Sequence, residues 1–282
     1  MDDINLKRIQ QIEYDMLKDI AHFCDQNNIE YFITGGTLLG AIRHGGFIPW
    51  DDDIDIGMDL KNYKKFLRIA RDSFPKKYFI QNFKTEKKYN YAWTKIRLNG
   101  TTFMDARMTN FEIHSGVFID IFLYNGISDN KICRITQTIA ARIQRVLLRK
   151  FYYLECDVTN PHSNAIYYIL PEFLRRGLIY ILDHIVNVDC TKTRWCYDTY
   201  YATVGKECKY RSKWFKNLKK VRFRDEYFLA PNDPEAWLES KYGDWQTLPP
   251  ESERIGHGDT IFDSNKDYTF YYGEKLKRKL NK

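Results

Sequence analysis

The sequence predicts an α+β fold, because helical and strand patterns alternate along its first half and helical patterns dominate its middle. Apolar residues recur at helical spacing from residue 5 to residue 27. Within the next thirty residues a strand pattern, two glycines, a helical turn and an acidic strand follow one another. We therefore expect a core that contains a sheet, with additional helices after it.

The individual elements carry their own signals. Helical periodicity covers residues 5–27, 37–44, 59–74, 131–156 and 171–188. Strand patterns, rich in β-branched and aromatic residues, cover residues 29–36, 53–58, 91–104 and 116–124. Asn27 and Pro75 are natural helix ends, and Asn99-Gly100 predicts a hairpin turn within the third strand pattern.

The composition is that of a folded protein without a membrane-spanning helix. Of the 282 residues, 44% are hydrophobic and 16% aromatic, well above the level of a disordered chain. The first fifteen residues mix acids and bases, unlike a secretory signal, and no uncharged apolar run reaches the roughly 18 residues of a transmembrane helix. We therefore expect a cytoplasmic protein.

The cysteines favour free thiols in a reducing compartment. The chain has six of them, and no two form a C-x-x-C pair. The alternative is a zinc site built from Cys190, Cys196 and Cys208 with His184, but it lacks the paired spacing that zinc knuckles use.

The net charge of +7 favours anionic partners without resembling that of a dedicated nucleic-acid binder. Much of it lies on the predicted helix over residues 131–150, which carries Arg142, Arg145 and Arg149 on one side. Its other side is apolar, with Ile132, Ile135, Ile139, Ile143 and Val146. The basic side could rest on an anionic membrane or sugar polymer; the better supported alternative is the solvated side of an ordinary core helix.

The stretch GGTLLGAIRHGGFIPWDDDIDIGM, residues 35–58, combines glycines with a dense group of aspartates. A calcium loop starting at Asp51 would need glycine at Ile56, so that interpretation fails. A P-loop fails as well, because Ala41 and Ile42 stand where Lys and Ser or Thr are required. A dinucleotide fingerprint needs glycine at Thr37.

A glycine turn that approaches a phosphate, followed by a D-x-D strand that binds a divalent metal, explains this stretch. Strand alternation places Asp53 and Asp55 on one side, and a metal would cancel their mutual repulsion. Oxygen ligands favour Mg²⁺ or Mn²⁺ over zinc. Asp120, within the apolar strand GVFIDIFLY, also requires a cation or another partner.

These motifs resemble the LicD family, which includes bacterial phosphocholine transferases and is related to the fukutins within the nucleotidyltransferase superfamily. The resemblance continues in YAWTKIRLNGTTFMD, HSGVFIDIFLY and KYGDWQTLPPESERIGHGD. It implies a small mixed sheet flanked by helices, in a single domain over residues 1–282. Within it we expect a catalytic core at about 1–130, a helical extension at 131–222 and a C-terminal segment at 223–282 that returns to the core.

The resemblance further implies a catalytic metal site of Asp53, Asp55 and Asp120, with Asp120 also a candidate base toward the acceptor. The implied reaction transfers phosphocholine from CDP-choline, or another phosphorylated alcohol from a CDP-linked donor, to a hydroxyl of a cell-surface glycan, which could be lipid-linked. Ribitol or glycerol phosphate transfer, nucleotidyl transfer from a nucleoside triphosphate, and a non-enzymatic glycan- or nucleic-acid-binding protein are the alternatives. The last would leave three matched acids unexplained.

Further residues are candidates for substrate binding. Gly35, Gly36 and Thr37 are expected to cradle phosphates. Two basic pairs, Arg43 with His44 and Lys95 with Arg97, are candidates for the diphosphate and the nucleotide, or else are exposed charges. The remaining candidates are Trp50, for substrate or loop packing, and Arg254 and His257, which the resemblance places over the site.

Overall fold

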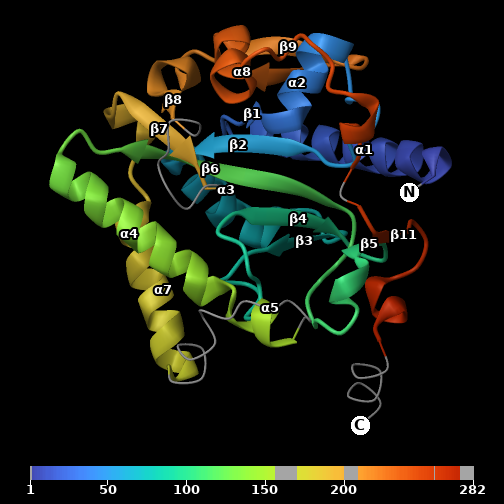
Figure 1. Ribbon diagram of the computed structural model, residues 1–282, viewed down its shortest axis with the longest axis horizontal. Helices are drawn as coiled ribbons and strands as arrows, with labels where there is room; N and C mark the ends of the chain where they lie inside the picture. The colour runs from blue at the N-terminus through green and yellow to red at the C-terminus, as the bar shows by residue number, and fades with distance from the viewer. Residues whose placement is uncertain (1, 156–169, 200–208, 257, 274–282) are drawn as a thin grey trace.

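The computed structural model describes residues 2–155, 170–199, 209–256 and 258–273, and its centre is a mixed seven-stranded sheet (Figure 1). The main strand order is β1-β2-β6-β4-β3, and β7 pairs with β6 and with β8. Only the β2–β6 pair is parallel among these strands. The strands are β1 Phe32–Ile33, β2 Asp55–Asp59, β3 Tyr78–Gln81, β4 Thr94–Leu98, β6 Phe118–Ile127, β7 Trp195–Asp198 and β8 Tyr210–Arg211.

Two small two-stranded sheets and the helices surround this sheet. The additional strand pairs are β9 Lys219–Phe223 with β10 Glu226–Ala230, and β5 Thr102–Asp105 with β11 Thr260–Asp263. The helices are α1 Asp3–Gln26, α2 Gly35–His44, α3 Leu60–Ser73, α4 Lys131–Leu148, α5 Lys150–Glu155, α7 Glu172–Val186 and α8 Pro234–Tyr242. Among the helices in the described ranges, none has the length and hydrophobicity to cross a bilayer.

The α+β prediction is confirmed, and two local predictions need correction. Asn99-Gly100 turns the chain, with Gly100 at φ 74°, but the predicted hairpin is wrong because β5 pairs with β11 and not with β4. In the described part of segment 131–222, α4, α5 and α7 are helices, and β7 and β8 join the central sheet, so the segment is not only a helical extension. Local patterns predicted the turn, whereas distant segments supplied the pairing partners.

Alternation along the strands separates a core face from a polar face. Ile56 and Ile121 are neighbours on β2 and β6, are fully buried, and belong to one apolar cluster with residues of α1 and α3 such as Leu17 and Phe66. Asp55 and Asp120 each precede one of these isoleucines and lie on the opposite face, because successive side chains in a strand alternate. The apolar core therefore holds the strands that carry the acids.

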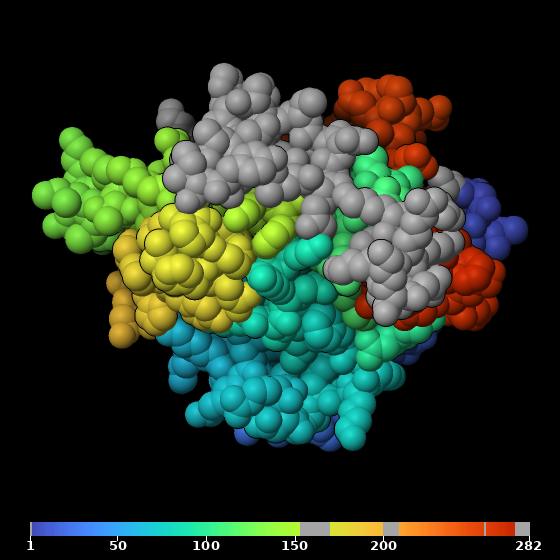
Figure 2. Space-filling view, turned by 90° about the horizontal axis from the view of Figure 1, so that it is seen from below, coloured from blue at the N-terminus to red at the C-terminus, as the bar shows by residue number. Residues whose placement is uncertain are grey.

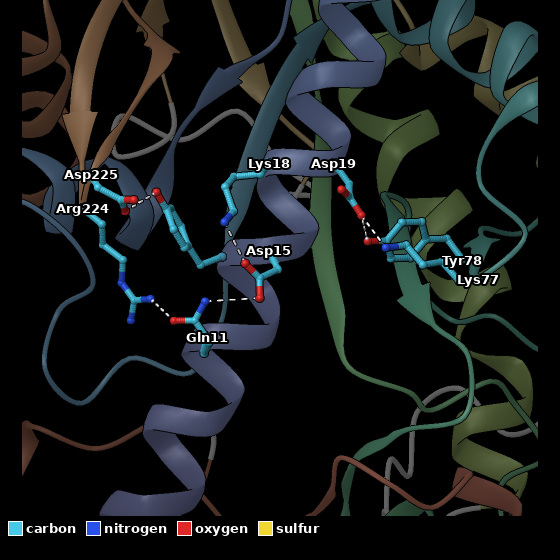
Figure 3. A network of polar contacts seen from close by, with 9 residues as sticks. Gln11, Asp15, Lys18, Asp19, Lys77, Tyr78, Arg224 and Asp225 are labelled. Atoms are coloured by element: carbon cyan, nitrogen blue, oxygen red, sulfur yellow. Dashed lines mark hydrogen bonds and ion pairs between the residues drawn. The ribbon is translucent and has the colours of Figure 1, made fainter.

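Helix α1 is attached to the domain by polar contacts on its outer side as well as by its apolar side (Figure 3). Asp19 accepts a hydrogen bond from the Tyr78 hydroxyl at 2.6 Å, which joins α1 to β3. Nearer the N-terminus, Arg224 donates to the side chain of Gln11 at 3.0 Å, which joins α1 to the β9–β10 turn. These contacts fix α1 between two parts of the chain far apart in sequence.

His114 lies before β6 and is held as a neutral ring. The Gly116 amide donates to its Nδ1 at 3.2 Å, so Nε2 carries the proton and donates to Asn99 Oδ1 at 2.9 Å. The ring stacks on Phe79, and burial lowers the pKa of His114 to about 3. Below pH about 6.5 the unfolded chain therefore binds a proton that the folded protein excludes.

We expect His114 to lower the free energy of unfolding by about 2 kcal/mol between pH 7 and pH 5, a contribution opposite in sign to that of the buried acids Asp55 and Glu13. Urea unfolding at both pH values measures the change. His114→Gln should unfold with a smaller pH dependence than the wild type, while the exposed-site control His22→Gln should retain all of it. Equal pH dependence in His114→Gln and the wild type would contradict the assignment.

Candidate functional site

Three charged residues form one row across the polar face of the sheet. Asp55 on β2 lies opposite Asp120 on β6, and Asp120 lies opposite Lys95 on β4. Lys95 Nζ is 2.7 Å from Oδ1 and 2.9 Å from Oδ2 of Asp120, and both side chains are more than nine-tenths buried. The lysine thus supplies the cation that the burial of Asp120 requires.

Asp53 joins Asp55 and Asp120 from the segment just before β2. One carboxylate oxygen from each residue can be chosen so that all three lie within 4.8 Å of one another. No other group of three or more His, Cys, Asp or Glu residues in the described ranges comes close enough for a metal. Three convergent oxygens suit a hard divalent cation such as Mg²⁺ or Mn²⁺.

Burial and nearby negative charge both disfavour the ionised form of Asp55. Burial, followed by the charges of Asp53 and Asp120, raises the pKa of Asp55 well above its usual range. Glu13 on α1 is fully buried nearby, and its pKa is raised for the same reasons, burial first and then the charge of Asp53. Neither oxygen of Glu13 has a hydrogen-bond partner among the described residues. A bound cation would relieve this accumulation of negative charge.

The glycine turn supports the acids directly. Gly35 opens α2 at φ 57°, and a Cβ atom there would overlap Oδ2 of Asp55 and lie 3.0 Å from its Cγ. At Gly36, a Cβ would be 2.6 Å from Oδ2 of Asp51. Thr37 Oγ1 accepts the amide hydrogen of Asp55 at 2.7 Å. The turn and the acidic strand therefore fit each other, and of the three predicted phosphate-binding residues Gly35 lines the adjoining cavity.

The acids lie on the wall of a cavity of about 590 Å³. Trp93 is at the centre of an aromatic wall, with ring centroids 4.4 Å from Tyr91 and 5.4 Å from Phe122. Basic side chains line other parts of the cavity: Lys95, Arg97, Arg107, Arg145, Arg149 and Lys241. The cavity therefore offers carboxylates for a metal, cations for phosphate and aromatic faces for an organic group.

Lys95 and Arg97 both line this cavity, as their shared face predicted. Arg97 is largely committed to its wall, because its guanidinium donates to the Gln81 side chain at 2.7 Å and to the Gly116 carbonyl at 2.7 Å. Lys95 instead contacts Asp120. The two residues therefore differ: Arg97 supports the wall, and Lys95 contacts the acids.

Four other predicted site residues do not line the cavity: Arg43, His44, Trp50 and Arg254. Arg43 donates to the Trp245 carbonyl at 2.8 Å. The Arg254 guanidinium lies 5.4 Å from the centre of the Trp50 ring. The Trp50 and His44 ring centroids are 6.5 Å apart. These contacts join α2 and the loop after it to the C-terminal segment. His257 lies outside the described residues.

Several residues that line the cavity were not predicted from the sequence. Arg145 and Arg149 belong to the basic helix, whose charges were expected to face solvent or a membrane. Their i, i+4 spacing was visible, but nothing in it indicated which side of α4 faces the acids. Lys241 on α8 lies within the KYGDW motif, and its position in the motif was the only available signal.

The zinc alternative finds no support among the described residues. Cys190 and Cys196 are free, buried thiols that pack within the apolar core. His184 is exposed, and its Nδ1 contacts the Tyr180 carbonyl at 2.8 Å. Cys208 lies outside the described residues.

Comparison with known proteins agrees with this geometry. Residues 28–146, which include all three acids and part of α4, match the family described as LicD/FKTN/FKRP, nucleotidyltransferase domain. The chain is 28% identical to the lipopolysaccharide cholinephosphotransferase LicD of Haemophilus influenzae, over 91% of this chain and 97% of that protein.

Two more distant relatives share shorter segments. Human ribitol 5-phosphate transferase FKRP is 53% identical over 34 residues, which are 12% of this chain and 7% of that protein. Mannosyltransferase regulator 4 of Saccharomyces cerevisiae is 25% identical over 173 residues, 58% of this chain and 13% of that protein.

Proposed function

Through the domain at residues 28–146 the chain belongs to the LicD family, and we propose that it is a phosphotransferase that moves a phosphorylated small alcohol to a glycan hydroxyl. The donor we propose is CDP-choline, with CMP as the leaving group. The observation that carries the proposal is the convergence of Asp53, Asp55 and Asp120 on the wall of a cavity rich in cations and aromatic rings. The likeness to LicD of H. influenzae over nearly the whole chain supports it.

The three aspartates would hold Mg²⁺ or Mn²⁺, which would neutralise charge on the phosphoryl oxygens. Phosphoryl transfer depends mainly on positioning and charge neutralisation, so the remaining residues act by binding and orienting. Arg145 and Lys241 line the cavity and would contact the donor's diphosphate, whereas Arg107, also in the lining, is paired with Asp105. The acceptor oxygen would bond to the phosphorus of the transferred phosphoalcohol as the bond from that phosphorus to the CMP oxygen breaks, and the hydroxyl proton would pass to water.

Asp120 is assigned a positioning role in this reaction. Both of its oxygens lie within 2.9 Å of Lys95 Nζ, so the carboxylate is held in one orientation. Acceptance of the acceptor's proton by Asp120 would require this ion pair to open. We therefore treat Lys95 as the residue that orients Asp120 toward the other two acids.

The aromatic wall favours a choline-bearing donor over a polyol donor. A quaternary ammonium group is attracted to aromatic faces and cannot use hydrogen bonds, whereas ribitol and glycerol need hydrogen-bonding partners. Tyr91, Trp93 and Phe122 give such faces beside the acids. Ribitol phosphate transfer remains the second candidate, because FKRP is 53% identical to this chain over 34 residues and is named for that activity.

The proposal is tested by CMP release from CDP-choline, CDP-ribitol and CDP-glycerol, with Mg²⁺ or EDTA, in the presence of a glycan extract. We expect Mg²⁺-dependent CMP from CDP-choline. Pyrophosphate release from ATP or CTP, with no CMP from any CDP-linked donor, would instead establish nucleotidyl transfer. Glycan binding without turnover, unchanged in Asp53→Asn, would establish a binding protein.

Trp93→Leu tests the choline assignment separately. We expect the KM for CDP-choline to rise at least tenfold, because the cation loses its central aromatic face, with a smaller change in kcat. Trp50→Leu is the matched control, since Trp50 lies outside the cavity lining. If Trp93→Leu has the same KM for CDP-choline as the wild type, the aromatic wall does not bind the donor.

The proposed setting is the cytoplasm, with a glycan as acceptor and no nucleic-acid partner. Free thiols at Cys24, Cys133, Cys190 and Cys196 fit a reducing compartment. A lipid-linked glycan is an acceptor compatible with this setting, and the H. influenzae relative is named for a lipopolysaccharide.

A further inference from the structure

Helix α4 exposes its most hydrophobic side. The side toward the rest of the domain carries small and polar residues together with two leucines: Gln137, Ala140, Ala141, Gln144, Leu147 and Leu148 are all buried. The exposed side carries a single row of aliphatic residues, Ile132, Ile135, Ile139, Ile143 and Val146. Ile132 is 76% exposed and Ile139 51%. The row is therefore not the core face of an ordinary helix.

Helix α7 extends this apolar area. It packs along α4 at one edge of the molecule (Figures 1 and 2), and its Ile181 is 60% exposed. Ile185, near the end of α7, and Ile132, near the start of α4, line one open cavity of about 520 Å³. We call the exposed row on α4 together with Ile181 and Ile185 the α4–α7 surface. An apolar area that runs over two neighbouring helices calls for a partner.

The charges on α4 itself have one sign, although the acid Asp129, just before the helix, lines the same open cavity as Ile132. Helix α4 carries Lys131, Arg134, Arg142 and Arg145 and no acidic residue, and Arg149 follows at its end. At about 100° per residue, Lys131, Arg142 and Arg149 lie along one border of the aliphatic row, about 60–80° from its centre. Basic side chains that border an apolar row can keep their charges at the headgroups while their stems lie on lipid.

We propose that the α4–α7 surface lies on an anionic lipid bilayer, with α4 parallel to the membrane plane. A second copy of the chain fits this surface less well, because pairing two α4 helices would bring two wholly basic helices together. An anionic bilayer complements both the apolar row and its charged border. Since Arg145 of the same helix lines the main cavity, docking would place that cavity beside the membrane.

Flotation with vesicles tests the proposal without reference to turnover. The full chain is mixed with vesicles of phosphatidylcholine alone or with about one-third phosphatidylglycerol, and the bound fraction is measured. We expect binding to the anionic vesicles that is at least tenfold weaker for Ile135→Ser/Ile139→Ser. The matched control is Ile4→Ser, which alters an isoleucine that is 81% exposed at the far N-terminal end of α1.

Charge is tested on the same vesicles with Arg142→Gln, which should weaken binding several-fold, and with added salt, which should weaken wild-type binding. Circular dichroism checks that each variant is folded. Failure of the folded wild type to bind anionic vesicles overturns the proposal, as does equal binding by the double variant. A concentration-dependent dimer that Ile135→Ser/Ile139→Ser abolishes, without vesicle binding, would assign the surface to a second copy. These outcomes do not depend on the proposed transferase activity.

Discussion

Replacing Asp55 by asparagine is expected to reduce CMP release to less than a tenth of the wild-type rate while leaving the protein folded. Asp55 lies between Asp120 and the glycine turn, and its carboxylate is one of three whose oxygens lie within 4.8 Å. Removing one charged ligand from such a set weakens the binding of a divalent cation and the neutralisation of phosphoryl charge that depends on it. The CMP assay with Mg²⁺ measures the effect.

Stability should change in the opposite direction. Because the pKa of Asp55 is raised in the folded protein, the folded state holds a proton that the unfolded chain releases, and stability falls as the pH rises above the ordinary carboxyl range. Asparagine is not ionised and so removes the free-energy cost of a buried charge at position 55. The metal-free variant should therefore melt at or above the wild-type temperature at pH 7. Adding Mg²⁺ should raise the melting temperature of the wild type and not of Asp55→Asn.

Two companion variants complete the test. Asp53→Asn should lose turnover to the same extent, and so should Asp120→Asn, in which Lys95 is left without its carboxylate partner. The metal assignment would be ruled out if Asp55→Asn or Asp53→Asn kept more than a tenth of the wild-type activity. Activity retained in Asp120→Asn would leave that residue a structural role only.

Gly35→Ala is the second change with a large expected effect. Alanine adds only one carbon, but at this position that carbon would overlap the carboxylate of Asp55, and the backbone at φ 57° disfavours any side chain. We expect turnover to fall at least tenfold, because the acid must move from its place beside Asp120. The backbone conformation alone should cost about 1 kcal/mol of stability.

Gly45→Ala separates these two contributions. Gly45 ends the same helix at φ 70°, and a Cβ atom there would meet nothing within 4 Å. Gly45→Ala should therefore lose about as much unfolding free energy, measured by urea denaturation, as the backbone conformation costs in Gly35→Ala. It should keep nearly full activity. Equal activity losses in the two variants would mean that the helix as a whole, and not the contact with Asp55, supports catalysis.

Much of the site followed from local sequence patterns. The alternation of Asp53, Ile54, Asp55 and Ile56 identifies a strand with an acidic and an apolar side, because strand geometry repeats every two residues. Asp120 was recognisable for a different reason, the cost of burying one acid in an otherwise apolar strand, and the family resemblance grouped it with the other two acids. These patterns depend on neighbours within a few residues, and the fold class and the three acids could therefore be read from the sequence.

Only the tertiary structure decided which distant residues meet these acids. The ion pair of Lys95 with Asp120 depends on the register between β4 and β6, which the packing of both strands on one core fixes. The docking of α4 likewise decides that Arg145 faces the cavity while Ile139 faces outward, although periodicity alone predicts the reverse for an isoleucine row. A sequence specifies which residues share a face; the direction of that face depends on contacts between segments far apart in the chain.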